Sequence, residues 1–122
     1  MPHLTLQYTA NLHGFDADAA LRAINRALAE SGHFDEAAIK SRALRLDEYR
    51  VGTADAERGF VHAQLKVLPG RDAETRRQFA RMVLAAIETV LPSRHPETQL
   101  CVEVDELDAD AYTKRVIDAP SG

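Results

Sequence analysis

The sequence of 122 residues has a single cysteine, no long apolar run and no excess of basic residues. One cysteine, Cys101, excludes a disulfide within the chain and leaves no cysteine spacing that would indicate a metal site. A membrane-spanning helix needs about 20 apolar residues in succession, and no segment approaches that length. The net charge of -4 argues against a nucleic-acid-binding protein, because such proteins usually present a basic face.

Targeting and nucleotide-binding signals are missing as well. The N-terminus is neither basic nor followed by a long apolar stretch, so no signal peptide is visible and the expected location is the cytoplasm. The segment Gly70-Arg71-Asp72 is not a phosphate loop, and no glycine-rich nucleotide fingerprint occurs. We therefore expect one domain over residues 1–122, with a core of modest size.

Two halves of the chain, about residues 2–46 and 60–107, each show the order strand, helix, strand. The strands have alternating apolar and polar residues or short apolar runs, and the helices have apolar residues at helical spacing behind an aspartate that can cap them. The expected strands are 3–8, 39–46, 60–68 and 100–104. The expected helices run from Asp16 or Asp18 to about Ser31 and from Asp72 to about Leu91. The tail, residues 108–122, has no clear pattern.

The two halves predict an α+β fold in which two β-α-β units form a four-stranded sheet with both helices on one face. The other face of the sheet would be uncovered, and there Leu44 and Leu46 share a side of their strand with Lys40 and Arg42. A mixed apolar and cationic face on an uncovered sheet predicts an oligomer with sites between subunits. Cys101, in the last strand, is expected to be a small core residue.

Three basic residues are candidates for binding an anion. Lys40 and Arg42 are two apart on a strand, so both project from one face about 6.6 Å apart, which suits two carboxylates of one small molecule. Arg71 follows Gly70 just before the second helix, where an anion could also use the helix N-terminal amides. The simpler interpretation of each is a solvated surface charge.

The most informative residue is Pro2. Removal of Met1 would leave Pro2 with a free secondary amine at the start of a strand, and such an amine can act as a general base. Burial and nearby cations would lower the pKa of this amine and keep it neutral. The hypothesis depends on removal of Met1, because the nitrogen of a Met1–Pro2 peptide is an amide.

His3, Phe60 and His62 are possible parts of a pocket. The two histidines have no cysteine or carboxylate partner at metal-ligand spacing, so no metal site is predicted. The simpler interpretation of His62 is a hydrogen-bonded sheet residue, and that of Phe60 is packing.

Taken together, four segments resemble the 5-carboxymethyl-2-hydroxymuconate delta-isomerase family of the tautomerase superfamily. They are Met1-Pro2-His3-Leu4, Ile39-Lys40-Ser41-Arg42, the strand from Phe60 to Lys66, and Gly70-Arg71 followed by Glu74 and Arg76. The resemblance covers Pro2 to about Leu107, whereas the tail segment 111–114 is only loosely similar. It implies a homotrimer with active sites near subunit boundaries, and cofactor-free isomerisation of a dicarboxylate substrate in the degradation of homoprotocatechuate.

The resemblance also implies roles for individual residues. Pro2 matches the proton-transferring base, Arg71 matches a cation that binds a substrate carboxylate, and Arg42 matches the next strand arginine. Lys40 stands where arginine is expected, which keeps the charge but loses the planar, bidentate fork of a guanidinium.

Three functions remain open from the sequence. The first is an isomerase of a hydroxymuconate-type diacid that uses Pro2 as general acid and base. The second is a tautomerase of another enol acid, such as a different 2-hydroxydienoate or a phenylpyruvate-like enol. The third is a non-catalytic oligomeric module that holds an anion through Lys40, Arg42 and Arg71. N-terminal processing separates the third from the first two, because the general-base mechanism requires removal of Met1.

Overall fold

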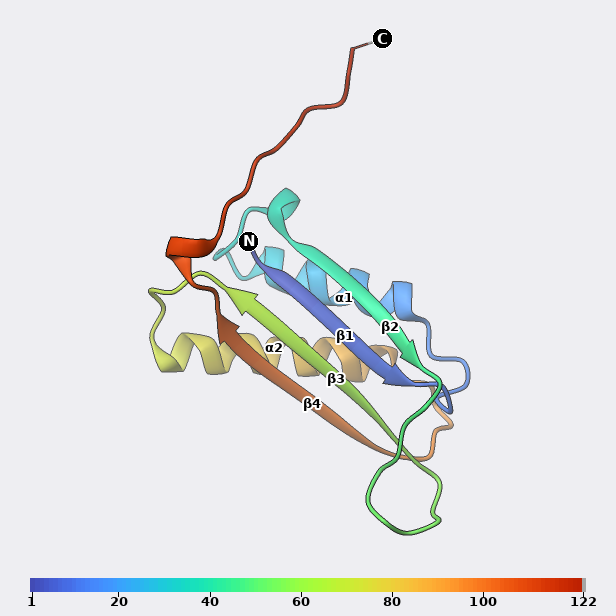
Figure 1. Ribbon diagram of the computed structural model, residues 1–122. Helices are drawn as coiled ribbons and strands as arrows, with labels where there is room; N and C mark the ends of the chain where they lie inside the picture. Colours follow the sequence, from blue (N-terminus) through green and yellow to red (C-terminus); the bar gives the residue numbers. More distant parts are fainter. Residues whose placement is uncertain (122) are drawn as a thin grey trace.

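One four-stranded sheet packs against two helices in the computed structural model, which describes residues 1–121 (Figure 1). The strands are β1 (His3–Thr9), β2 (Lys40–Leu46), β3 (Arg58–Val67) and β4 (Glu97–Glu106). The helices are α1 (Ala17–Glu30) and α2 (Ala73–Val90), and two short 3₁₀ turns are η1 (Glu36–Ala38) and η2 (Ala109–Ala111). Within these residues no helix is both long enough and apolar enough to span a bilayer.

The strand order is β2-β1-β3-β4, with parallel outer pairs and an antiparallel central pair. Each parallel pair encloses one helix in the sequence, so the sheet joins two β-α-β units through β1 and β3. Both helices cover the same face of the sheet (Figure 1). The predicted α+β arrangement is confirmed, and β4 is longer than the expected 100–104.

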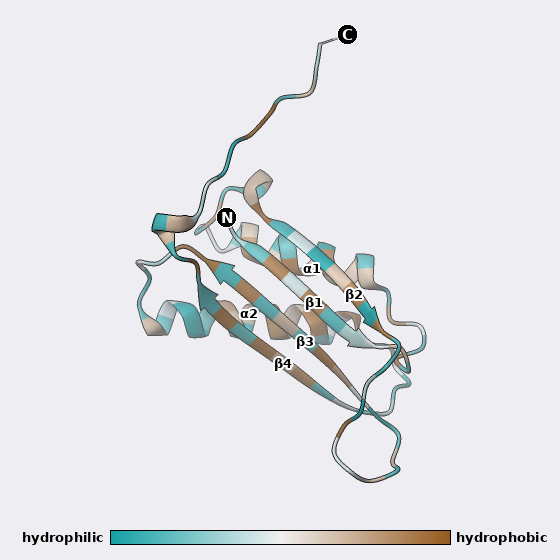
Figure 2. Cartoon of the chain, viewed as in Figure 1, coloured by the Kyte–Doolittle hydropathy of each residue, from teal (hydrophilic) through white to brown (hydrophobic). Residues whose placement is uncertain are grey.

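Alternation along the strands separates a covered face from an uncovered one, and Figure 2 shows apolar and polar residues following one another along each strand. The covered face of the two central strands is fully buried against the helices. It consists of Leu4, Leu6, Val61, Ala63, Leu65 and Val67. The helices contribute Ile24, Leu28, Phe79, Val83 and Ile87, which are also fully buried. Burial of a side chain of this kind stabilises a fold by about 1.5–3 kcal/mol.

Only one face of β4 contributes to this core. Leu100, Val102 and Val104 pack against it, whereas Cys101 is exposed. The expectation that Cys101 is a core residue is wrong. The apolar residues of β4 occupy the even-numbered positions, and the period of two in a strand turns Cys101 to the opposite face.

The uncovered face is basic on one side and acidic on the other. The register aligns Lys40, His3, Lys66 and Asp105 in one row across the four strands, and Arg42, Thr5, Gln64 and Glu103 in the next. Leu44 follows Arg42 on the same side of β2 and is 47% exposed. The predicted mixed face is therefore present, with cations on β2 and carboxylates on β4.

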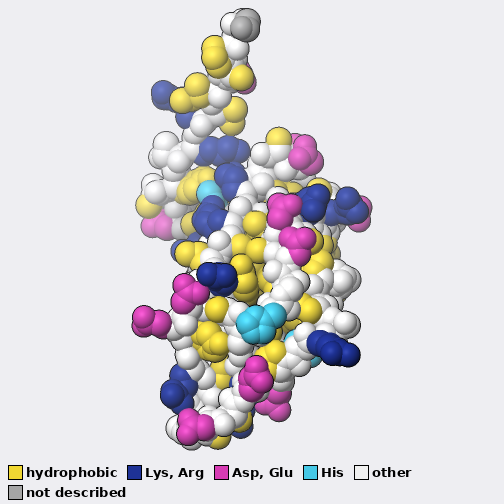
Figure 3. Space-filling model, turned by 90° about the vertical axis from the view of Figure 1, so that its right-hand side faces the viewer, with side chains coloured by type: hydrophobic (Ala, Val, Ile, Leu, Met, Phe, Trp, Pro, Cys, Tyr) yellow, Lys and Arg dark blue, Asp and Glu magenta, His cyan; other side chains and the backbone are white. Residues whose placement is uncertain are grey.

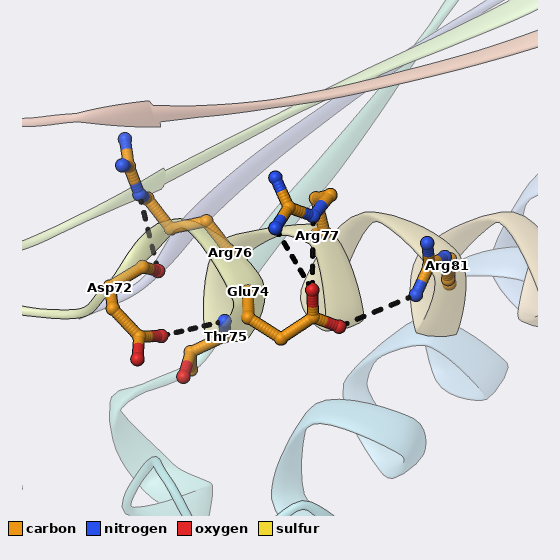
Figure 4. Close-up of polar contacts among 6 residues, drawn as sticks. All are labelled: Asp72, Glu74, Thr75, Arg76, Arg77 and Arg81. Carbon is orange, nitrogen blue, oxygen red and sulfur yellow. Dashed lines mark hydrogen bonds and ion pairs between the residues drawn. The ribbon is translucent and has the colours of Figure 1, made fainter.

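Asp72 begins α2 as the sequence predicts. Its carboxylate oxygen Oδ1 accepts a hydrogen bond from the backbone N–H of Thr75 at 2.9 Å (Figure 4). Hydrogen bonds from Thr75 hold the pKa of the Asp72 carboxyl below its usual range, and the charges of Arg76 and Arg77 act in the same direction. In the first turn of the helix, Glu74 accepts from Arg77 and pairs with Arg81 (Figure 4).

Replacement of Asp72 by asparagine is expected to reduce stability in a pH-dependent way. The variant keeps a capping oxygen but loses the charge. Because the folded-state pKa of Asp72 is depressed, its carboxylate stabilises the fold above the unfolded-state pKa of about 3.9, and this contribution is lost as the pH falls through the folded-state pKa. Urea denaturation should show a lower midpoint for Asp72→Asn at neutral pH, and the difference from the parent should narrow in acid. Asp55→Asn, in the exposed loop between β2 and β3, is the matched control. A difference for Asp72→Asn that stays constant with pH would contradict the prediction.

Candidate functional site

The candidate site surrounds the N-terminus, at the end of the sheet where β1 begins. The α-amine of Met1 lies 3.4 Å from the carbonyl oxygen of Ala38, and the ammonium group of Lys40 donates to the same oxygen. The backbone N–H of Lys40 donates to the carbonyl of Pro2 at 3.1 Å. The Pro2 side chain is fully buried. Pro2 is therefore fixed by the β1–β2 ladder and by packing, beside a lysine.

The amine at this end of β1 is a weak base. Burial lowers the pKa of the Met1 α-amine from 8.0 to about 6, and the hydrogen bond and charge of Lys40 add to this effect. Lys114 lowers it further, whereas Asp35 acts in the opposite direction. An amine in this environment is mostly neutral at pH 7, which is the state that a general base requires.

His3 lies between Arg42 and the C-terminal segment. Nη2 of Arg42 is 3.0 Å from Nδ1 of His3, and Nε2 of His3 is 3.0 Å from the hydroxyl oxygen of Tyr112. Burial lowers the pKa of His3, and the charges of Lys40 and Arg42 lower it further. A guanidinium group can only donate, so Nδ1 is the acceptor in the first bond. The proton of the neutral ring is then on Nε2, which donates to Tyr112.

Arg71 lies beyond the same end of the sheet, but other residues hold it. Its guanidinium group donates to the carbonyls of His33 at 3.2 Å and Leu68 at 3.4 Å. It also stacks over two aromatic rings, 4.8 Å from the centre of Phe34 and 5.5 Å from that of Phe79. The guanidinium is thus anchored in an aromatic seat formed by Phe34 and Phe79, and none of these contacts involves a residue of β1 or β2.

Within this chain, Phe60 and His62 do not adjoin Pro2. The β1–β3 register places His62 opposite Gln7, four residues along β1 from His3, which corresponds to about 13 Å of strand. Phe60 is farther along, where its backbone N–H donates to the hydroxyl of Thr9. Nε2 of His62 lies 3.3 Å from a carboxylate oxygen of Glu103, so His62 is the hydrogen-bonded sheet residue of the simpler interpretation.

Sequence reasoning missed two residues of this site, Tyr112 and Lys114. The tail has no periodic pattern, and only the contact with His3 reveals that it returns to the N-terminus. Figure 3 shows basic side chains gathered around a histidine at the base of the C-terminal segment. Lys114 lowers the pKa of both the terminal amine and His3, which places its charge near both groups.

The arrangement combines a weakly basic amine with several fixed cations. Lys40, Arg42 and Lys114 supply positive charge, and such a group can hold carboxylates while it keeps a neighbouring amine neutral. Within the described part of the chain, no group of three or more His, Cys, Asp or Glu side chains is placed to hold a metal ion. The geometry suits proton transfer on a small anionic molecule.

Comparisons with known proteins agree with this description. A family model described as 5-carboxymethyl-2-hydroxymuconate isomerase matches residues 2–117. The 5-carboxymethyl-2-hydroxymuconate Delta-isomerase of Escherichia coli is 30% identical over 90 residues, which are 73% of this chain and 71% of the relative. A crystal structure of a 5-carboxymethyl-2-hydroxymuconate isomerase from Deinococcus radiodurans R1 superposes with a TM-score of 0.85 at 28% identity, covering 93% of this chain and 88% of that one. A structure described as "Q0 fused 4-OT wild type symmetric trimer" shares the fold, with a TM-score of 0.61 at 15% identity over 85% of each chain.

Proposed function

Because the chain belongs to the 5-carboxymethyl-2-hydroxymuconate isomerase family, we propose that it isomerises 5-carboxymethyl-2-hydroxymuconate or a similar 2-hydroxydienoate diacid through the free amine of Pro2. The chain is an isomerase of the tautomerase superfamily. The observation that carries the proposal is that Pro2 is fully buried and fixed at the start of β1 beside Lys40, in surroundings that lower the pKa of the terminal amine. Removal of Met1 moves the terminal amine by one residue, into the backbone position of Pro2, where Lys40 is also a neighbour.

The proposed reaction moves one proton and needs no cofactor. The neutral Pro2 amine takes the proton of the 2-hydroxyl group, and the C2–oxygen bond becomes a carbonyl as the conjugated double bonds shift. The ammonium group then returns a proton to a carbon of the dienolate, which gives the 2-oxo isomer. The amine is regenerated, and no electrons leave or enter the substrate. A general base of this kind contributes about 10²–10⁴-fold to a rate.

Lys40 and Arg42 are proposed to bind a carboxylate of the substrate, and Arg71 the second one. Lys40 and Arg42 share the uncovered face with His3, whose neighbour in the sequence is Pro2. Arg71 is near the N-terminus of α2, where backbone amides add to the positive potential. Its remaining N–H groups are available after the two bonds to backbone carbonyls.

A homotrimer is proposed as the active assembly. Association that joins the basic β2 side of one subunit to the acidic β4 side of the next is heterologous, and such contacts form a ring where the rotation between subunits closes. A symmetric trimer with the same fold supports this arrangement. The degradation of homoprotocatechuate as the pathway, and the cytoplasm as the location, stay predictions from the sequence.

Replacement of Arg42 by alanine is expected to reduce kcat/KM by about 10–100-fold, mainly through KM. A hydrogen bond to a charged group contributes about 1.5–3 kcal/mol, and 1.4 kcal/mol corresponds to a factor of ten. Arg45→Ala is the matched control, because Arg45 is on the same strand but on the opposite face and pairs with Asp47. Initial rates over a range of diacid concentrations separate the two constants. Equal losses of kcat/KM in the two variants would contradict a role of Arg42 in substrate binding.

The direct test of the function is a spectrophotometric assay with 5-carboxymethyl-2-hydroxymuconate, on protein whose mass confirms that it begins at Pro2. Turnover at a rate well above that of the uncatalysed reaction is the expected result. Binding of the diacid without turnover would contradict the proposal and favour an anion-binding module.

A further inference from the structure

The C-terminal segment is directed back to the N-terminus by specific hydrogen bonds. The backbone N–H of Leu107 donates to the carbonyl of Val67 at 2.8 Å, which ties the segment to the end of β3. Asp108 then starts the turn η2, where its carboxylate accepts from the N–H of Asp110 and its carbonyl from the N–H of Ala111. The turn takes the chain off the line of β4, and the next residue is Tyr112 (Figure 1).

Tyr112 is held against His3 by its ring and by its hydroxyl group. The two rings meet edge to face, with their centres 5.9 Å apart and their planes at 72°. The hydroxyl oxygen is 3.0 Å from Nε2 of His3. Farther along the segment, Val116 and Ile117 are exposed, Ile117 to 86%. The tail therefore contacts the body of the protein at the candidate site.

The hydrogen atoms of this network can be assigned one after another. Arg42 donates to Nδ1 of His3, so the neutral ring carries its proton on Nε2 and donates to the oxygen of Tyr112. The hydroxyl hydrogen of Tyr112 is not used in that bond. No other hydrogen bond of Tyr112 is found within residues 1–121. Tyr112 thus has a fixed oxygen and an uncommitted donor, beside the charges of Arg42 and Lys114.

We propose that Tyr112 contacts the substrate by donating its hydroxyl hydrogen to the oxygen on C2, and that His3 is the positioning residue that orients this donor. The inference rests on the proposed function and extends it to the C-terminal segment. The C2 oxygen gains negative charge when its proton leaves. A donor that is already oriented stabilises this charge without reorganisation. Tyr112 keeps its proton throughout, so the proton balance given for Pro2 is unchanged.

This donor defines the class of substrate more narrowly than the cations do. Lys40, Arg42 and Lys114 would attract any small carboxylate, whatever its other groups. Tyr112 adds a neutral hydrogen bond that requires an acceptor on C2, and an oxygen substituent there supplies one. We therefore expect the site to favour 2-hydroxy and 2-oxo acids over carboxylic acids of the same length that lack the oxygen on C2.

The test compares Tyr112→Phe with Tyr8→Phe. Both variants remove one hydroxyl group from a half-buried tyrosine, but Tyr8 lies at the far end of β1, where its ring packs on Phe15. Loss of one oxyanion donor reduces kcat by about 10²–10³-fold in strong cases, and we expect a loss of at least about tenfold for Tyr112→Phe with a smaller change in KM. Tyr8→Phe should retain parental kcat. Equal kcat values for the two variants and the parent would overturn the inference.

The positioning role of His3 is tested with two amide variants. His3→Gln can place an N–H near the position of Nε2 and so still donate to Tyr112, whereas His3→Asn can place an acceptor near Nδ1 for Arg42 but no donor for Tyr112. His3→Gln should keep more of kcat than His3→Asn. In the Tyr112→Phe background the two His3 variants should have equal kcat values, because there is no hydroxyl group left to orient. The reverse order, or the same difference in both backgrounds, would remove the positioning role.

Nitrogen-15 NMR of the ligand-free parent tests the assignment of hydrogen atoms without turnover. Nε2 of His3 should carry the proton and Nδ1 should not, and the opposite tautomer would contradict the network.

The activity measurements also distinguish this inference from the proposed function. Absence of isomerase activity in parent protein that begins at Pro2 would contradict both the proposed function and the reaction step given to Tyr112. An active parent with a fully active Tyr112→Phe variant would end only the inference about Tyr112.

Discussion

Protein that retains Met1 is expected to have at most about one hundredth of the isomerase activity of protein that begins at Pro2, because a general base contributes about 10²–10⁴-fold. With Met1 in place, the Pro2 nitrogen is an amide, which has no lone pair available for a proton at neutral pH. The α-amine of Met1 is itself a weak base, with a pKa lowered to about 6, but it is one residue away from the position of the Pro2 amine. It is therefore not expected to replace that amine.

The measurement uses two preparations of one sequence, distinguished by mass and assayed under the same conditions. Pro2→Ala, likewise with Met1 removed, is the control, because it retains a primary amine at the new terminus and should keep part of the activity. In the active form kcat/KM should rise with pH through the pKa of the Pro2 amine, since the base works unprotonated. Burial and Lys40 place this rise below the usual α-amine value near 8. Equal activity with and without Met1 would exclude Pro2 as the base.

Replacement of Phe79 by alanine is expected to reduce the free energy of unfolding by about 3–5 kcal/mol. Phe79 is fully buried, and its ring centre lies 5.1 Å from those of both His33 and Phe34. It thus connects α2 with the segment that follows α1, beneath the guanidinium group of Arg71. Truncation would leave a cavity at this junction and remove one of the two rings on which Arg71 stacks.

Urea denaturation at neutral pH measures the loss as a lower midpoint with an unchanged slope. Ile117→Ala is the control, because Ile117 is also apolar but is almost fully exposed. Its effect should stay within about 0.5 kcal/mol, as for most surface substitutions. A loss below about 1 kcal/mol for Phe79→Ala would contradict the prediction. It would mean that neighbouring side chains fill the cavity more completely than the packing indicates.

The sequence predicts the fold well because local patterns carry most of the information. Alternation in β1 and β3, apolar spacing in the helices and the capping aspartates Asp16 and Asp72 all mark elements that form as expected. Cys101 lies on the face opposite to the expected one, because that expectation treats its strand as wholly buried. In a sheet covered on one side only, each strand has a buried and an exposed face, and the phase of the alternation decides between them.

The candidate site is less predictable, since tertiary contacts build half of it. Pro2, Lys40 and Arg42 could be grouped because one strand pair aligns them. Tyr112 and Lys114 could not be grouped with them from the sequence. Residues 108–121 have no periodic pattern and reach the N-terminus through a single turn. The aromatic seat of Arg71 likewise depends on Phe34 and Phe79, which are separated in the chain and meet only in the folded protein.

The carbonyl oxygen of Ala38 accepts from two donors, the α-amine of Met1 and the ammonium group of Lys40. Only the first of these bonds would be lost with Met1, because the second is donated by Lys40 on β2. Lys40 would keep its anchor, and the carbonyl would be free to face the new terminus. Maturation by one cleavage would then change the chemistry of a nitrogen atom without a conformational change, so that the mature and immature chains have nearly the same shape and differ mainly in reactivity.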